Sequence, residues 1–160
     1  MTVKIFLRGA LIAALYFVLT FFLQPISYGP IQVRVSEALT VLPYFFPESI
    51  IGLTVGCLLA NFFSPFGPID VIFGSLCTLI GAILTYLVRK TGKPYLGILP
   101  PILVNAFGVG LYVSILTRQP PTFNFYHYLT VSLTIGIGEA ISVGIGGSLL
   151  ITYLLKRKGN

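Results

Sequence analysis

The chain has 160 residues, of which 56% are hydrophobic and only 9% are charged. A soluble domain carries about 25% charged residues, so polar groups cannot cover this surface and lipid must replace water around it. The formal net charge of +6 does not indicate nucleic acid, because the basic residues gather at the edges of apolar runs and not along one face.

The first apolar run covers residues 5–23. It is long for the apolar part of a signal peptide, and Gln24 and Pro25 follow it in place of a small-residue cleavage site. We therefore expect a retained first transmembrane helix. Its Ala10 and Ala14 form a small-residue pair that lets another helix approach closely, and internal packing explains this pair about as well as docking to a partner does.

Prolines and glycine break the chain after this run. Residues 24–35, which include Pro30, are predicted to form a loop. A short helix follows, with Ser36 as its predicted N-cap and Glu37 in its first turn. It is expected to end near residues 43–47.

Four further apolar runs complete the chain. The third span is predicted over residues 48–63 and the fourth over 69–88, with a Ser-Pro-Phe-Gly-Pro break between them. A fifth span ends near residue 116, and its two adjacent prolines either begin its main part or kink it. After a loop over residues 118–124, the sixth span covers about residues 125–155.

The distribution of basic residues tests this count of spans. With both termini inside, eight of the ten basic residues lie on the inner side, and Arg34 and Arg118 lie outside. Five or seven spans would place one terminal basic cluster outside. The prediction is a single domain over residues 1–160, an all-α integral membrane protein with a bundle of six transmembrane helices and both termini cytoplasmic.

The chain has only four acidic residues, and an ionised carboxylate in the middle of a bilayer costs at least about 2.5–3.5 kcal/mol. Glu48 is predicted at the inner edge of the third span, as a solvated acid at a helix start. Glu37 and Asp70 each lie in the first turn of a helix that begins outside, where Asn61 ends the third span. These three side chains are expected to converge at one level, although both acids could also only complement helix dipoles.

Glu139 is predicted about 12 residues into the sixth span, roughly 18 Å below the outer edge. Asn105 is expected at similar depth in the fifth span. Small residues around the glutamate predict a face for close helix packing: Gly136, Gly138, Ala140 and Gly144. A carboxylate at this depth must face the protein interior or a water-filled cavity. It is therefore either part of a structural hydrogen-bonded pair or the floor of an outward-facing pocket.

Carboxylates, carboxamides and aromatic rings would suit a planar solute with many N–H donors better than an anion or a lipid. His127, the sole histidine, is expected at the membrane interface, and one histidine predicts no metal site. Cys57 and Cys77 are expected as small buried hydrophobic residues. No catalytic triad or phosphate-binding loop can be assembled, so we predict no catalytic residues, no cofactor and no ATP hydrolysis by this chain.

Two stretches carry a family resemblance: GPIQVRVSEALTVLPYF at residues 29–45 and GCLLANFFSPFGPIDVIFGSL at residues 56–76. They resemble the queuosine-precursor S components of energy-coupling factor (ECF) importers, the QueT family. The resemblance extends over the whole chain, including the alanine pair in the first helix and the late glutamate in a glycine-rich last span.

The resemblance implies a multi-pass protein of the cell membrane that binds a scarce solute near its outer loops. Such an S component docks through the alanine face of its first helix onto a membrane coupling protein with two ATPase subunits. It is thought to release its substrate after reorienting in the bilayer. The implied substrate is a 7-deazaguanine such as preQ1, the aminomethyl precursor of queuosine.

That ligand suits the predicted pocket, because a guanine edge presents adjacent N–H donors and the aminomethyl group is a cation. We assign Glu37 and Glu139 as its carboxylates. The supporting residues are expected to be Asp70, Asn61 and Asn105, with Arg34 paired to a pocket acid. Three alternatives stay open: an S component for another vitamin-like solute, a small membrane enzyme that uses Glu139 and His127, and a pore-forming or structural bundle.

Overall fold

The computed structural model describes residues 2–29 and 31–159. Three residues that the predictions include, Met1, Pro30 and Asn160, lie outside the described residues. The described residues contain helices and connecting turns and no β-strand, which confirms the predicted all-helical class. The elements follow in chain order: α1 (Thr2–Phe22), α2 (Gln24–Ser27), η1 (Val35–Tyr44), α3 (Ser49–Asn61), η2 (Asp70–Gly74), α4 (Ser75–Val88), η3 (Arg89–Thr91), η4 (Pro94–Ile98), α5 (Leu99–Val104), η5 (Asn105–Val109), α6 (Gly110–Leu116), α7 (Phe125–Glu139), η6 (Ala140–Gly147) and α8 (Ser148–Gly159).

Several of these elements join end to end into long apolar helices. Within the described residues, four helices are long and apolar enough to cross a membrane: Val3–Phe22, Asp70–Thr91, Pro94–Leu116 and Phe125–Arg157. They match the predicted first, fourth, fifth and sixth spans within a few residues. The prolines in the third of these helices begin α5, where a missing backbone N–H costs nothing. The predicted third span corresponds to α3, which is apolar but shorter.

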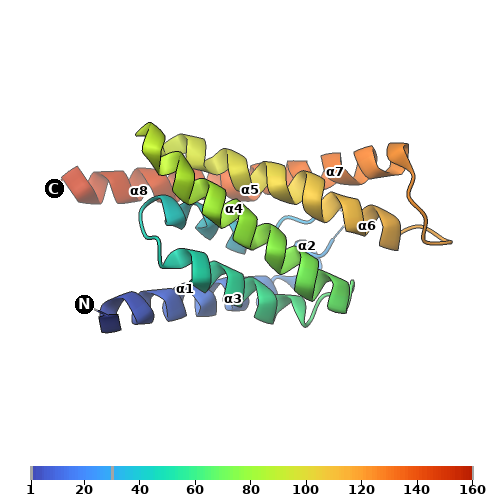
Figure 1. Ribbon diagram of the computed structural model, residues 1–160, viewed down its shortest axis with the longest axis horizontal. Coiled ribbons are helices and arrows are strands. Elements are labelled where there is room, and N and C mark those ends of the chain that lie inside the picture. The colour runs from blue at the N-terminus through green and yellow to red at the C-terminus, as the bar shows by residue number, and fades with distance from the viewer. Residues whose placement is uncertain (1, 30, 160) are drawn as a thin grey trace.

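The helices run roughly along one axis (Figure 1). The first turn of α1 and the last turn of α8 lie at the same end of this axis, at the left of the view, and the loop over residues 117–124 lies at the opposite end. α1 and α3 lie side by side, and α4 packs against α3 and α5. The start of α1 and the end of α8 therefore lie at one end of the bundle.

Small residues bring α1 and α3 together. A Cβ on Gly52 would lie 2.5 Å from the carbonyl oxygen of Gly9, and one on Gly56 would lie 2.7 Å from that of Ala13. Side chains larger than hydrogen would therefore force these helices apart. Ala10 and Ala14 lie on an exposed face of α1 instead, so the internal packing of α1 against α3 does not account for this pair.

The predicted short helix is η1, a 3₁₀-helix buried among α1, α4 and η6. Glu37 lies in its first turn, as predicted. The prediction that Ser36 is the N-cap is wrong: Arg34 occupies that position, and the Ser36 hydroxyl lies 2.6 Å from the Thr20 hydroxyl. In a 3₁₀-helix, side chains three residues apart lie above one another on the same face. η1 therefore presents distinct rows of side chains to α1, α4 and η6.

Three of the long helices contain a wide, π-helical turn, and a polar residue stands at the start of each. Asp70 begins η2, Asn105 begins η5, and Glu139 immediately precedes η6. Such turns are uncommon in helices overall, but those that occur are often found at functional sites, because they interrupt the regular hydrogen-bond pattern and redirect side chains. The polar residues at these three turns are therefore candidates for a functional site.

Candidate functional site

Glu37 and Glu139 lie close together inside the bundle, joined by one carboxamide. The Asn105 Nδ2 atom donates to Glu139 Oε1 at 2.9 Å, which confirms the similar depth predicted for these two residues. Asn105 also interacts with the Glu37 carboxylate, and the Tyr16 hydroxyl donates to Glu37 Oε1. Three elements that are distant in sequence, η1, η5 and the end of α7, thus bring two acids to one place.

Asp70 forms the second part of the cluster. Its Oδ2 atom lies 3.5 Å from Arg34 Nη2, and both side chains are buried, which confirms that Arg34 pairs with an acid. Asn61 Nδ2 donates to the Asp70 backbone carbonyl at 3.0 Å, and the Tyr112 hydroxyl donates to Asp70 Oδ1. The predicted convergence is therefore confirmed for Asn61 and Asp70, whereas the contacts of Glu37 are with Tyr16 and Asn105.

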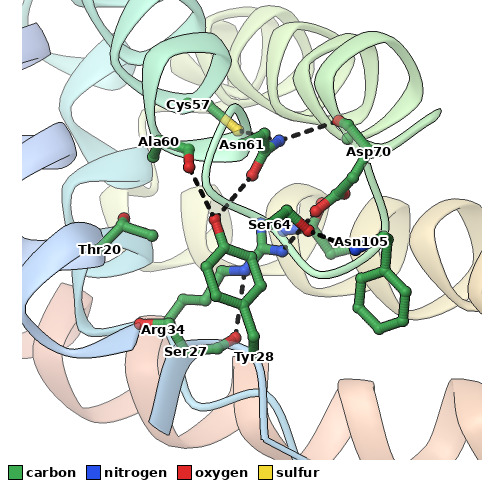
Figure 2. Close-up of polar contacts among 12 residues, drawn as sticks. Thr20, Ser27, Tyr28, Arg34, Cys57, Ala60, Asn61, Ser64, Asp70 and Asn105 are labelled. Atoms are coloured by element: carbon green, nitrogen blue, oxygen red, sulfur yellow. Dashed lines mark hydrogen bonds and ion pairs between the residues drawn. The ribbon is translucent and has the colours of Figure 1, made fainter. Parts of the chain in front are cut away.

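Tyr28 covers this second part (Figure 2). Its ring centroid lies 4.9 Å from the Arg34 guanidinium carbon, a cation–π contact. Its hydroxyl donates to the Asn61 side-chain oxygen at 3.2 Å and to the Ala60 carbonyl at 3.1 Å. Burial raises the pKa of Tyr28 to about 12, so the hydroxyl stays protonated and remains a donor at neutral pH.

The cluster has more acceptors than the protein satisfies. Within the described residues, eight buried side-chain atoms have no hydrogen-bond partner, and four of them belong to the charged groups of this cluster: Arg34 Nη2, Glu37 Oε2, Asp70 Oδ2 and Glu139 Oε2. Three carboxylates against one guanidinium leave two negative charges uncompensated when all are ionised. Unpaired buried charge is costly, so this arrangement favours a ligand that brings N–H donors or a positive charge.

The acids are closed off in this structure. Glu37 and Asp70 are fully buried and Glu139 is 3% exposed. The structure also contains a hollow of about 300 Å³, and Tyr28, Gly29 and Gln32 contribute to its wall. None of the three acids lines this hollow. Tyr28 links the two, because it lines the hollow and also hydrogen-bonds to Asn61.

The backbone before Arg34 is held tightly against α7. Gln32 has a left-handed φ of 51°, which is unusual for a residue with a side chain. A Cβ on Gly138 would collide with the carbonyl oxygens of Ile31 and Gln32. Of the predicted small-residue face, Gly138 therefore makes a close packing contact, whereas a Cβ on Gly144 would meet nothing within 4 Å.

The prediction for Glu48 needs correction, whereas that for Cys57 is confirmed. Glu48 is not simply a solvated acid, because Arg8 Nη1 lies 2.5 Å from its Oε1 atom in an ion pair. Cys57 is buried as predicted, but its sulfur also accepts hydrogen bonds from Asn61 at 3.3 Å and Thr78 at 3.2 Å. It therefore contributes to holding Asn61 in place.

His127 is separated from the acids. It lies in the first turn of α7, twelve residues before Glu139, and its Nε2 atom lies 3.0 Å from the Thr117 hydroxyl. Within the described residues, no three histidine, cysteine or acidic side chains are grouped as metal ligands would be. The structure therefore does not bring His127 and Glu139 together as an acid–base pair.

The sequence prediction missed the tyrosines that bind the acids. Tyr16 and Tyr112 lie in long apolar helices, among nine tyrosines that residue type alone does not distinguish. One signal was available in α1. Tyr16 and Thr20 are four residues apart and so share one helix face, which predicts a polar strip inside the first span.

Long apolar helices around a buried charged cluster are features of a multi-pass membrane transporter. The chain belongs to the QueT transporter family, whose model matches residues 6–156, and this confirms the family resemblance in the sequence. It is thereby a member of a transporter family and not of an enzyme family.

A curated relative is the queuosine precursor transporter QueT of Lactococcus lactis subsp. cremoris (strain MG1363). It is 51% identical over 73 residues, and the match covers 44% of this chain and 43% of the relative. No solved structure matches the chain.

Proposed function

We propose that this chain is the substrate-binding subunit, or S component, of an ECF-type importer, and that its solute is a queuosine precursor, a 7-deazaguanine such as preQ1. The observation that carries the proposal is the set of buried carboxylates with unpaired oxygens inside a membrane bundle. The name of the Lactococcus relative supports the choice of solute.

The chemistry of this solute complements the cluster. A guanine edge presents adjacent N–H donors that one carboxylate can accept, and an aminomethyl cation needs a second acid. We assign these roles to Glu37 and Glu139, whose Oε2 atoms have no partner among the described residues. Asn105 lies between them and can read a ring carbonyl once it turns its amide.

Asp70, Asn61 and Arg34 form the supporting part of the proposed site. The Arg34–Asp70 ion pair places a positive charge beside the acids, and Asn61 fixes the backbone of Asp70. Since Tyr28 stacks on Arg34 and also lines the hollow, movement of Tyr28 would connect this hollow with the acids. The solute would then enter from the end of the bundle that holds residues 117–124.

We further propose that the chain forms a six-helix bundle with both termini cytoplasmic. α3, at about 1.5 Å per residue, is too short to cross a bilayer core by itself, and η1 is buried among other helices. They would form the two short spans of the bundle. The excess of basic residues on the terminal side and the position of both ends in Figure 1 support this orientation.

The energy for transport would come from partners: a membrane coupling protein and two ATPase subunits. Ala10 and Ala14 lie on an exposed face of α1 and offer this coupling protein a surface for close approach. Co-purification of the tagged chain from its native host, followed by mass spectrometry, tests this part. Absence of any ATPase from the purified assembly would refute it.

Calorimetric titration of the purified chain tests the solute. We expect saturable binding of preQ1 and much weaker binding of thiamine, riboflavin and folate. Tighter binding of one of these vitamins would instead make the chain an S component for that vitamin. If no solute of either kind binds to folded protein, the function as a binding subunit is wrong.

A further inference from the structure

A second cavity lies at the opposite end of the bundle from residues 117–124, where α1 begins and α8 ends. Its volume is about 480 Å³, and its lining includes Arg8, Phe45, Phe46, Leu154 and Arg157. None of these residues belongs to the acidic cluster described above. The cavity therefore needs an explanation of its own.

Arg8 is held in position from two sides. Its guanidinium carbon lies 4.4 Å from the centroid of the Phe46 ring, and its Nη1 atom lies 2.5 Å from Glu48 Oε1. The Arg8 side chain is still 46% exposed, so its remaining N–H donors are open to the cavity or to solvent. This fixed guanidinium can bind an anion with little further loss of conformational freedom.

Arg157 supplies a second positive charge. It lies three residues after Leu154, so both side chains share one face of α8 and border the same cavity. Arg157 is exposed, and no ion pair joins it to an acid of the described residues. Two guanidinium groups against the single carboxylate of Glu48 leave one net positive charge at an apolar wall.

We propose that this cavity binds an anionic phospholipid, with its phosphate at Arg8 and Arg157 and an acyl chain against Phe46 and Leu154. The planar guanidinium matches phosphate oxygens in pairs. Basic pockets between the ends of transmembrane helices suit anionic headgroups at this level of a membrane. A free anion would leave the aromatic and leucine walls unused, which favours a lipid over inorganic phosphate.

Native mass spectrometry of the intact chain, titrated with phosphatidylglycerol or phosphatidylcholine, tests the site. We expect phosphatidylglycerol to bind preferentially and Arg157→Gln to weaken its binding about tenfold or more, because one charge-assisted contact is lost. The matched control is Lys93→Gln, which removes one positive charge from an exposed residue outside this cavity. Its lipid affinity should stay at the wild-type value.

Three results would overturn the proposal. Equal losses in Arg157→Gln and Lys93→Gln would mean that net charge alone attracts the lipid. Displacement of phosphatidylglycerol by inorganic phosphate would mean that the site takes a free anion. Unchanged lipid binding in Arg157→Gln would mean that the lipid does not bind at this cavity. Titration of preQ1 serves as a folding control, because this cavity is separate from the acidic cluster.

Discussion

The most informative single change is Glu139→Gln, because it alters one oxygen at the centre of the proposed site and keeps the shape of the side chain. In the structure, Glu139 Oε1 accepts from Asn105, and Oε2 has no partner among the described residues. Glutamine can keep an acceptor toward Asn105. At the other position it offers an amide donor, which faces the N–H donors of the ligand instead of accepting from them.

The magnitude follows from the bond that is lost. A hydrogen bond to a charged group contributes about 1.5–3 kcal/mol, and each 1.4 kcal/mol is about a factor of ten in affinity. We therefore expect the Kd for preQ1 to rise about 10- to 100-fold, measured by calorimetry in nanodiscs. The thermal unfolding midpoint should change little, because glutamine keeps the shape of the side chain and can still accept from Asn105.

Glu48→Gln is the matched control. It removes the same charge from an acid at the other end of the bundle, where the partner is Arg8. We expect its affinity for preQ1 to equal that of the wild type. Wild-type affinity in folded Glu139→Gln would instead mean that Glu139 only holds Asn105 in place, and the assignment of this acid to the ligand would be wrong.

Further predictions concern stability and docking. Arg34→Met leaves Asp70 buried without its ion partner, so we expect the free energy of unfolding to fall by about 3–5 kcal/mol. Adding Asp70→Asn to this variant should recover part of the lost unfolding temperature. No recovery in the double variant would contradict the pairing of Arg34 with Asp70. Gly138→Ala places a methyl group against the carbonyl oxygens of Ile31 and Gln32 and should cost about 1–3 kcal/mol in thermal unfolding. Gly144→Ala enters open space within a helix and should leave the midpoint unchanged or raise it slightly, because alanine has the higher helix propensity. Ala14→Leu changes an exposed face of α1, so stability should move by less than about 0.5 kcal/mol while co-purification of the proposed coupling protein falls. Unchanged co-purification would place the proposed docking surface elsewhere.

The long spans could be predicted because each is a run of apolar residues bounded by proline, glycine or basic residues. Depth counted along the sixth span also placed Glu139 level with Asn105, since helix rise is regular. The type of the short helix could not be predicted, because ten residues that are buried among other helices carry no periodicity that distinguishes 3₁₀ from α. Ser36 was misassigned because Thr20, its partner, belongs to another helix.

The acids of the site were identified because charge is rare in this chain, and their tyrosine partners were missed because tyrosine is common. A hydroxyl in an apolar run gives no sign of whether it meets a carboxylate or the membrane interface. The contact of Arg8 with Glu48 was missed for a related reason, since forty residues separate them and only the packing of α1 against α3 brings them together.

The wide turns at η2, η5 and η6 have a consequence for comparing this chain with its relatives. Each π turn holds about one residue more than an α turn, so it takes up an extra residue inside an otherwise regular helix. A relative with a one-residue deletion at 70–74, 105–109 or 140–147 is therefore expected to close the wide turn to a regular α turn. The two halves of that span would keep their present neighbours, while the polar residue at the turn would change direction.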